Sequence, residues 1–200
     1  MSELSLKVVE NFLPNFYAER EHCLGLEFGE QKYQHETYKN ISSDWGRYPI
    51  HLLEDVMGFP CQNILSFYRF TTEDSDSRID VHSDLSTGAD YASVLYLSTP
   101  EQDLKNFSGT ALFRHIPTGL RSINHTSVMK SLGYTDDIIS SIANDEHDES
   151  KWKMEGFVSM KSNRLVVYPA SIFHSKYPGK SFGKDKETGR LIWVNFFKGV

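Results

Sequence analysis

The sequence is poor in cysteine, with two among its 200 residues, and this scarcity excludes a protein held together by disulfides. Cys23 and Cys61 fit no zinc motif either, so we expect two free buried thiols in a reducing compartment. No apolar run approaches the 18 residues that a membrane-spanning helix needs. Residues 1–7 lack the apolar core of a signal peptide. These absences predict a cytoplasmic protein with no membrane partner.

Basic residues are also few, with 21 Lys and Arg against 27 Asp and Glu and a net charge of −6. Affinity for phosphates comes mostly from Lys and Arg, so this balance argues against a nucleic-acid partner. Seven prolines and 13 glycines are too few for a collagenous or low-complexity chain. Aromatic residues reach 13%, which favours strands. The length suits one domain, residues 1–200, with a core of its own.

Strand-forming residues dominate the chain after Pro60. Because turn residues separate most of these runs and few helices interleave them, the pattern predicts a mainly β protein with an antiparallel sandwich or barrel. The strands are expected at residues 63–71, 91–98, 109–115, 157–160, 163–168, 172–177 and 190–197.

Two segments interrupt or precede the strands. Residues 1–62 predict a short strand before Pro14 and flanking helices at 15–26 and 49–57. Residues 116–155 form a long insert with two predicted helices, at about 127–132 and 136–143, followed by an acidic stretch at 145–149. A connection of this length is functional or partly mobile, and we expect the acidic stretch to be a solvated face.

His82 stands out among the eight histidines because Asp84 follows it two positions later. In an extended segment these side chains point to one side, so they can bind the same metal ion. His174, in an apolar segment, is either a core histidine bonded to a carbonyl or a third ligand. Two imidazoles and one carboxylate leave three positions open, which suits non-haem Fe(II) that binds a cosubstrate and oxygen together.

Arg190 falls in phase with Ile192 and Val194, the apolar face of the last predicted strand. A guanidinium on a buried face needs an anion, which is either a protein carboxylate or a ligand carboxylate bound in two-pronged fashion. A tyrosine hydroxyl can complete such a site. Tyr96 and Tyr68 are the two candidates, and each can equally be a core aromatic residue.

The order of these motifs is more specific than any one of them. In sequence they are His82-Ser83-Asp84, VLYLS at 94–98, SGTALF at 108–113, NRLVVY at 163–168, His174 and Arg190. The set resembles the Fe(II)/2-oxoglutarate-dependent dioxygenase superfamily, on its prolyl-4-hydroxylase-like side, and a small uncharacterised bacterial or phage-type branch of it. The resemblance covers about residues 63–197.

This resemblance implies a double-stranded β-helix, or jelly roll, over residues 63–200, with the insert at 116–155 and the helical flank at 1–62. It implies that His82, Asp84 and His174 bind Fe(II) and form the catalytic centre. Arg190 would hold the distal carboxylate of 2-oxoglutarate, with Tyr96 or Tyr68 bonded to the same group. The implied reaction uses O2, oxidises a C–H bond, and releases succinate and CO2.

Two positions separate this chain from relatives with other chemistry. Halogenating members lack the carboxylate ligand, and Asp84 is present, which favours hydroxylation or a related oxidation. Members that repair nucleic acids carry a second arginine where this chain has Phe196. Ser98 and Ser108 replace an asparagine and a glycine that are usual in the family, so the 2-oxoglutarate carboxylate has fewer expected partners.

The substrate is expected to be an amino acid, a peptide or protein side chain, or a small metabolite. The insert and residues 74–80 are expected to flank the mouth of the site, and candidate wall residues are Trp45, Arg47, Tyr48, Arg114, His115 and Trp152. Two other functions stay open at this point. One is a cupin-like metal oxygenase that uses no keto acid, and the other is a non-catalytic jelly-roll binding module.

Overall fold

The computed structural model describes residues 6–33, 36–42, 48–75 and 77–200, and its strands form two antiparallel sheets. The larger sheet has seven strands in the order β1-β8-β5-β10-β4-β3-β2. Their bounds are β1 Lys7–Val9, β2 Gly29–Tyr33, β3 Glu36–Ser42, β4 Cys61–Thr71, β5 Tyr91–Tyr96, β8 Leu165–Pro169 and β10 Arg190–Gly199. The smaller sheet has the order β7-β6-β9, with β6 Gly109–His115, β7 Trp152–Ser159 and β9 His174–Tyr177.

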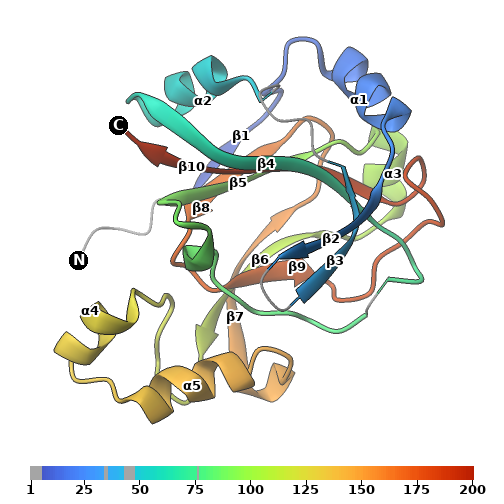
Figure 1. Cartoon of the computed structure of the whole chain (residues 1–200). Coiled ribbons are helices and arrows are strands. Elements are labelled where there is room, and N and C mark those ends of the chain that lie inside the picture. The colour runs from blue at the N-terminus through green and yellow to red at the C-terminus, as the bar shows by residue number, and fades with distance from the viewer. Residues whose placement is uncertain (1–5, 34–35, 43–47, 76) are drawn as a thin grey trace.

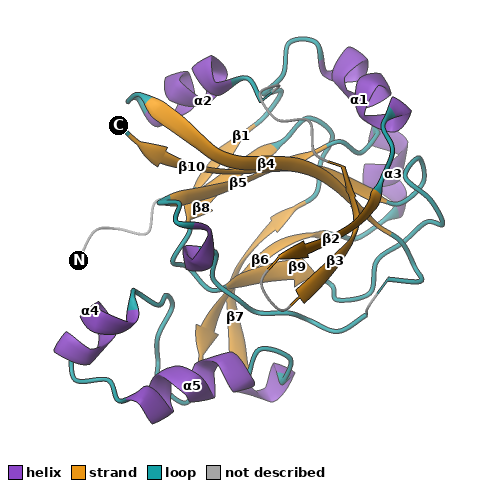
Figure 2. Ribbon diagram, viewed as in Figure 1, coloured by secondary structure: helices purple, strands orange, loops and turns teal. Residues whose placement is uncertain are grey.

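Helices occupy the outside of these sheets (Figures 1 and 2). Their bounds are α1 Phe16–Gly25, α2 Ile50–Met57, α3 Pro100–Lys105, α4 Thr126–Ser131 and α5 Asp136–Asn144, with short 3-10 turns at Leu85–Thr87 and Glu149–Lys151. Figure 1 places α1 and α2 above the larger sheet and α4 and α5 beyond the smaller one. The mainly β, antiparallel architecture that the sequence predicts is therefore confirmed.

The middle strands of the larger sheet are buried on both faces. Along β10, Leu191 and Trp193 face the helices, while Ile192 and Val194 face the smaller sheet, and all four are at most 9% exposed. This explains why β5, β8 and β10 read as nearly continuous apolar runs rather than as alternating ones. The same alternation sets which side chains can enter the space between the sheets.

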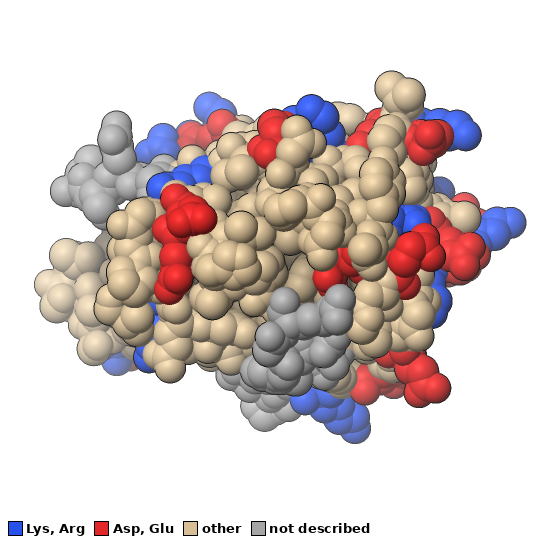
Figure 3. Space-filling model, turned by 90° about the horizontal axis from the view of Figure 1, so that it is seen from above, with Lys and Arg blue, Asp and Glu red and all other residues tan. Residues whose placement is uncertain are grey.

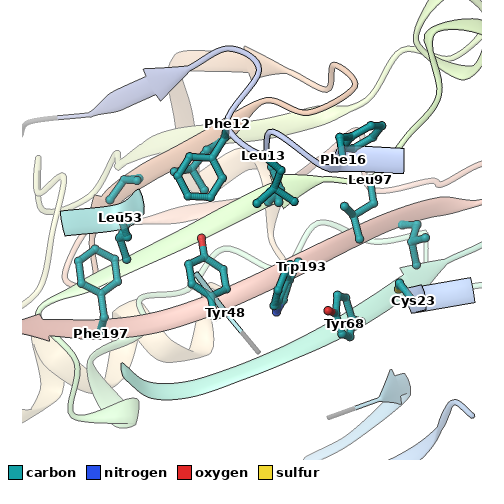
Figure 4. Close-up of a cluster of buried hydrophobic side chains, with 14 of the residues drawn as sticks. Phe12, Leu13, Phe16, Cys23, Tyr48, Leu53, Tyr68, Leu97, Trp193 and Phe197 are labelled. Carbon is teal, nitrogen blue, oxygen red and sulfur yellow. The ribbon is translucent and has the colours of Figure 1, made fainter. Parts of the chain in front are cut away.

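Three hydrophobic clusters hold the layers together. The first joins α1 and α2 to the outer face of the larger sheet, and Figure 4 shows ten of its members labelled, from Phe12 to Phe197. The second fills the space between the two sheets. The third covers the outer face of the smaller sheet with residues of the insert and of the segment before His82.

The insert packs mainly on that outer face. Ile142 of α5 and Trp152 lie in the third cluster with Ala111 and Phe113 of β6. His115 is fully buried there and contacts Thr118 through Nδ1 at 2.9 Å and Asp145 through Nε2 at 3.0 Å. The insert is thus fixed to the smaller sheet by buried side chains.

Several elements differ from the sequence-based expectations. The hairpin β2–β3 and the helix α3 were not expected, although Thr99 and Gln102 form a capping box at the start of α3. Strand β7 begins at Trp152 rather than at 157, and β9 begins at His174 rather than at 172. The predicted helices at 15–26, 49–57, 127–132 and 136–143 correspond to α1, α2, α4 and α5 within a few residues.

Two observations concern the outer surface. Among the described residues, no helix is long and apolar enough to cross a membrane. In Figure 3, which views the molecule from above, most of the face is neither acidic nor basic; acidic side chains lie within it as well as at its edge, and basic side chains lie mostly at its edge.

Candidate functional site

The three predicted metal ligands come together at one point. The main chains of His82 and His174 pair in an antiparallel bridge, with N–O distances of 3.1 and 3.0 Å. The Asp84 amide donates to the Ala170 carbonyl at 2.7 Å, which fixes the next turn of the same loop. Nε2 of His174 lies 3.2 Å from Asp84 Oδ2, and Nε2 of His82 lies 3.6 Å from Asp84 Oδ1. One ion could contact all three groups.

Two backbone carbonyls orient the imidazoles. Nδ1 of His82 lies 2.8 Å from the Asp80 carbonyl, and Nδ1 of His174 lies 3.0 Å from the Ile172 carbonyl. A carbonyl oxygen only accepts, so each Nδ1 donates a proton to it. Both Nε2 atoms then point toward Asp84, and each can offer a lone pair to a metal ion when it carries no proton. This is the arrangement in which a histidine ligates a metal while its other nitrogen is held by the protein.

The charges around the triad support an ionised carboxylate. Burial raises the pKa of Asp84, but His174 and then His82 outweigh that effect and leave the pKa below its ordinary value. Desolvation lowers the pKa of His82, but the hydrogen bond to Asp80 and the charges of Asp84 and Asp80 outweigh this effect. The net result is a pKa raised to about 9. Without a cation the cluster therefore attracts positive charge, here as a proton on His82.

Arg190 is buried between the sheets, with only 4% of its surface exposed. Its guanidinium carbon lies 5.5 Å from the centre of the Tyr96 ring, and Nη2 lies 3.5 Å from the Gly109 carbonyl, a long contact. Nε has no hydrogen-bond partner, and no carboxylate of the described residues forms an ion pair with the side chain. Burial lowers the pKa of this guanidinium, which reflects the cost of an uncompensated charge.

Tyr96 lies against that guanidinium from the neighbouring strand. It is fully buried, and its hydroxyl is 2.7 Å from Thr110 Oγ1 on β6. Burial raises the pKa of Tyr96, so the phenol remains a neutral hydrogen-bond donor. The structure thus places Tyr96 next to Arg190, and the contact of both with one ligand carboxylate stays a prediction.

The candidate metal ligands and the guanidinium are connected through strand β6. Leu112 of β6 pairs with His174, and Gly109 of the same strand accepts from Arg190. These points are three positions apart, or about 10 Å along a strand. Tyr168 lies at the His174 end, with its ring centre 4.5 Å from that of His174. Together these groups can bind a cation at one end and a carboxylate at the other.

A protein-family comparison matches residues 67–197 to a "Family of unknown function (DUF6445)". The chain belongs to this family. No curated protein matches the chain at a significant level. The match includes all three residues of the metal triad as well as Tyr96 and Arg190.

Three solved structures with the same fold are distant from this chain in sequence. One is the non-haem α-ketoglutarate-dependent epimerase SnoN from nogalamycin biosynthesis, with a TM-score of 0.54, 14% identity, and coverage of 97% of this chain and 77% of that one. A second is HygX from Streptomyces hygroscopicus with nickel and 2-oxoglutarate bound. Its TM-score is 0.53 at 13% identity, and the alignment covers 97% of this chain and 82% of HygX. A third is AviO1 from Streptomyces viridochromogenes, with a TM-score of 0.53 at 10% identity and coverage of 97% of this chain and 89% of AviO1. At sequence identities of 10–14%, this likeness shows that the DUF6445 chain shares the fold of these proteins, and it shows the fold alone.

Tyr68, the other predicted cosubstrate residue, lies elsewhere. It is fully buried, and its hydroxyl donates to the Glu19 carboxylate of α1 at 2.5 Å. Figure 4 shows it beside Trp193 in the cluster under α1, on the face of the larger sheet that points away from Arg190. The pairing of Tyr68 with Trp193 across β4 and β10 places it there. The structure does not bring Tyr68 to the site.

The expected wall residues also lie away from the triad where they are described. Tyr48 belongs to the cluster under the helices, and His115 and Trp152 pack on the outer face of the smaller sheet. Arg114 pairs with Glu155 at 2.9 Å. Trp45 and Arg47 lie outside the described residues.

The insert contacts the segment before His82 through its acidic stretch. The Glu146 carbonyl accepts from the Val81 amide at 3.0 Å, and Nδ1 of His147 contacts the Ile79 carbonyl at 2.9 Å. The acidic stretch at 145–149, expected as a solvated face, therefore docks partly on the segment that carries His82.

Sequence reasoning missed three groups at the site: Asp80, Thr110 and Tyr168. Asp80 precedes His82 by two positions, the same spacing that singled out Asp84, so this signal was available. Tyr168 is in phase with Val166 on β8 and faces the space between the sheets. No single-sequence signal distinguishes Thr110 from any other small residue of a strand.

Proposed function

We propose that this DUF6445 chain is an Fe(II)- and 2-oxoglutarate-dependent dioxygenase. The observation that carries this proposal is Arg190, a buried guanidinium without a protein carboxylate, in the same interior as the triad His82, Asp84 and His174. A cupin-like metal enzyme or a binding module has no use for such a group. 2-Oxoglutarate supplies the missing carboxylate.

The residues present fit both absent groups. Two imidazole Nε2 atoms and one ionised carboxylate form the donor set that non-haem Fe(II) takes when further positions stay open for other ligands. The guanidinium of Arg190 matches a carboxylate in shape and charge. Bound Fe(II) and 2-oxoglutarate would supply the oxidising power for the reaction with O2, with succinate and CO2 as coproducts.

The protein's own groups have separate tasks in this proposal. Asp84 keeps negative charge at the metal, and the carbonyls of Asp80 and Ile172 hold the two imidazoles in the ligating tautomer. Arg190 with Tyr96 anchors the far end of the cosubstrate. The apolar side chains between the sheets keep water from the reacting groups.

Hydroxylation of an amino acid, a peptide or protein side chain, or a small metabolite is the reaction we propose, in the cytoplasm and within the prolyl-4-hydroxylase-like branch. The carboxylate ligand Asp84 favours hydroxylation over halogenation. The negative net charge argues against a nucleic-acid substrate. The whole chain acts as a single catalytic domain in this view.

The test is the release of succinate from 2-oxoglutarate. Protein purified without oxygen and loaded with Fe(II) should convert 2-oxoglutarate to succinate slowly in air, even without a substrate. Asp84→Ala should abolish this and weaken iron binding, because it removes the charged ligand. Asp90→Ala, a change at an exposed aspartate on the same loop, is the matched control and should leave both unchanged. Unchanged iron binding and succinate release in His82→Ala and Asp84→Ala would refute the proposal.

A further inference from the structure

Tyr168 on β8 is a buried polar side chain that the proposed function has not used. It is 3% exposed and lies on the face of the larger sheet that points into the space between the sheets, with Val166 and Ile172 as neighbours in the interior cluster. Its position alternates with Val167, which faces the helices instead. The strand therefore directs the phenol of Tyr168 toward the candidate site.

The ring of Tyr168 contacts a metal ligand. Its centre is 4.5 Å from the centre of the His174 imidazole, at an interplanar angle of 50°. Nε2 of the same imidazole lies 3.2 Å from Asp84 Oδ2. The ring of Tyr168 therefore lies at the metal end of the proposed cosubstrate site.

The Tyr168 hydroxyl has no hydrogen bond to any residue in the described part of the chain. The residue is nevertheless buried, since only 3% of its surface is exposed. A buried phenol without a partner is costly, and such hydroxyls usually find one. A neutral phenol can donate one hydrogen bond to an acceptor placed beside it.

We infer that Tyr168 donates a hydrogen bond to the metal-bound, keto-acid end of 2-oxoglutarate, as a cosubstrate-binding residue distinct from Arg190 and Tyr96. The contact with His174 places it at that end rather than at the distal carboxylate. The inference rests on the proposed function, since the acceptor is the proposed cosubstrate. It assigns one protein donor to each end of the ligand: Tyr168 to the keto acid and Arg190 to the tail.

Two keto acids separate these roles. 2-Oxoglutarate has both ends, whereas 2-oxopentanoate has the same keto acid and chain length but a methyl group in place of the distal carboxylate. Dissociation constants are measured by calorimetry without oxygen on the Fe(II)-loaded protein. Tyr168→Phe should weaken the binding of both ligands about tenfold, the loss of one hydrogen bond to a charged group. Arg190→Gln should weaken 2-oxoglutarate alone.

Tyr91→Phe is the matched control, because it removes a phenol from the neighbouring strand on the opposite face of the sheet. It should change neither dissociation constant. Iron affinity and melting temperature, measured for each variant, show that Tyr168→Phe is folded and loaded. The visible absorption of the iron–keto acid complex is a second reading and should shift in Tyr168→Phe only.

The outcomes separate the two ideas. If the Fe(II)-loaded wild-type protein binds neither keto acid, the proposed function fails, and this inference fails with it. If the wild type binds both and Tyr168→Phe binds both within a factor of two of it, only the role of Tyr168 fails. If Tyr168→Phe weakens 2-oxoglutarate but not 2-oxopentanoate, the phenol contacts the tail, and the assignment to the keto-acid end is wrong.

Discussion

Replacing Arg190 with methionine should make the protein without its cosubstrate more stable. The guanidinium is 4% exposed, its Nε has no partner, and the hydrogen bond from Nη2 to the Gly109 carbonyl is 3.5 Å long. Exchanging a poorly compensated buried charge for an apolar side chain of similar volume is often neutral or stabilising, by about 1–4 kcal/mol. In a chain of this size each kcal/mol raises the melting temperature by about 2–4 °C. We therefore expect a rise of at least about 2 °C in Arg190→Met.

The same change should remove the response to the cosubstrate. At a hundred times its dissociation constant, 2-oxoglutarate should stabilise the metal-loaded wild-type protein by about 2.7 kcal/mol, and it should stabilise Arg190→Met far less. Thermal and urea unfolding, with and without 2-oxoglutarate, measure both effects. Arg164→Met is the control, because Arg164 pairs with Glu10 at 2.6 Å. It should be slightly destabilised and keep the full response.

A destabilised Arg190→Met would contradict this reasoning. A loss of more than about 1 kcal/mol without cosubstrate would mean that the guanidinium makes a net stabilising interaction within the protein, as a purely structural arginine does. The case for a ligand carboxylate at Arg190 would then lose its physical basis.

Three further predictions concern the metal, a close contact and a thiol. Asp84→Ala should weaken Fe(II) or Ni(II) binding at least about a hundredfold by calorimetry, since the two remaining imidazoles lack a charged partner; equal affinity would exclude Asp84 as a ligand. Gly109→Ala should cost about 1–3 kcal/mol in urea unfolding, because the added carbon would lie 2.2 Å from the Val158 carbonyl oxygen; wild-type stability would show that β6 and β7 can separate there. Burial raises the pKa of Cys23 to about 12, so at pH 8 this thiol should react with a disulfide reagent about a thousandfold more slowly in the native than in the unfolded protein. Because this pKa is higher in the folded state, the contribution of Cys23 to stability is complete below about pH 9 and is lost as the pH rises toward 12; fast labelling of the native protein would contradict the buried position.

Some residues of the site could be predicted from the sequence, because alternation along a strand determines which face of the sheet their side chains occupy. Arg190 shares its phase with Ile192 and Val194, which are buried between the sheets, and the guanidinium lies with them. The spacing of His82 and Asp84 likewise predicted two side chains directed to one point. In both cases the rule is local, so a single sequence contains it.

Tyr68 shows where this reasoning ends. Strand β4 carries aromatic residues on both faces, with Phe67 toward the smaller sheet and Tyr68 and Phe70 toward the helices. Alternation alone cannot say which face is which. The register with β10 decides it by pairing Tyr68 with Trp193, and register depends on contacts between residues far apart in the chain.

The hairpin and the packing position of the insert were not predicted, for related reasons. Residues 29–42 are mostly polar, and in the described part of the chain the hairpin pairs with the larger sheet at Ile41 and Ser42, opposite Arg69 and Tyr68. Such an edge has little hydrophobic signal. The helices of the insert were expected from their own patterns, but their place on the outer face of the smaller sheet is set by tertiary contacts such as that of Ile142.

The central claim is that one interior binds a ferrous ion and a keto acid together. The most direct measurement is the visible spectrum of the protein titrated without oxygen, first with Fe(II) and then with 2-oxoglutarate. We predict a charge-transfer band that appears only when both are present and saturates at one equivalent of each per chain. A spectrum that stays featureless at saturating amounts of both, in protein shown to be folded, would contradict the account.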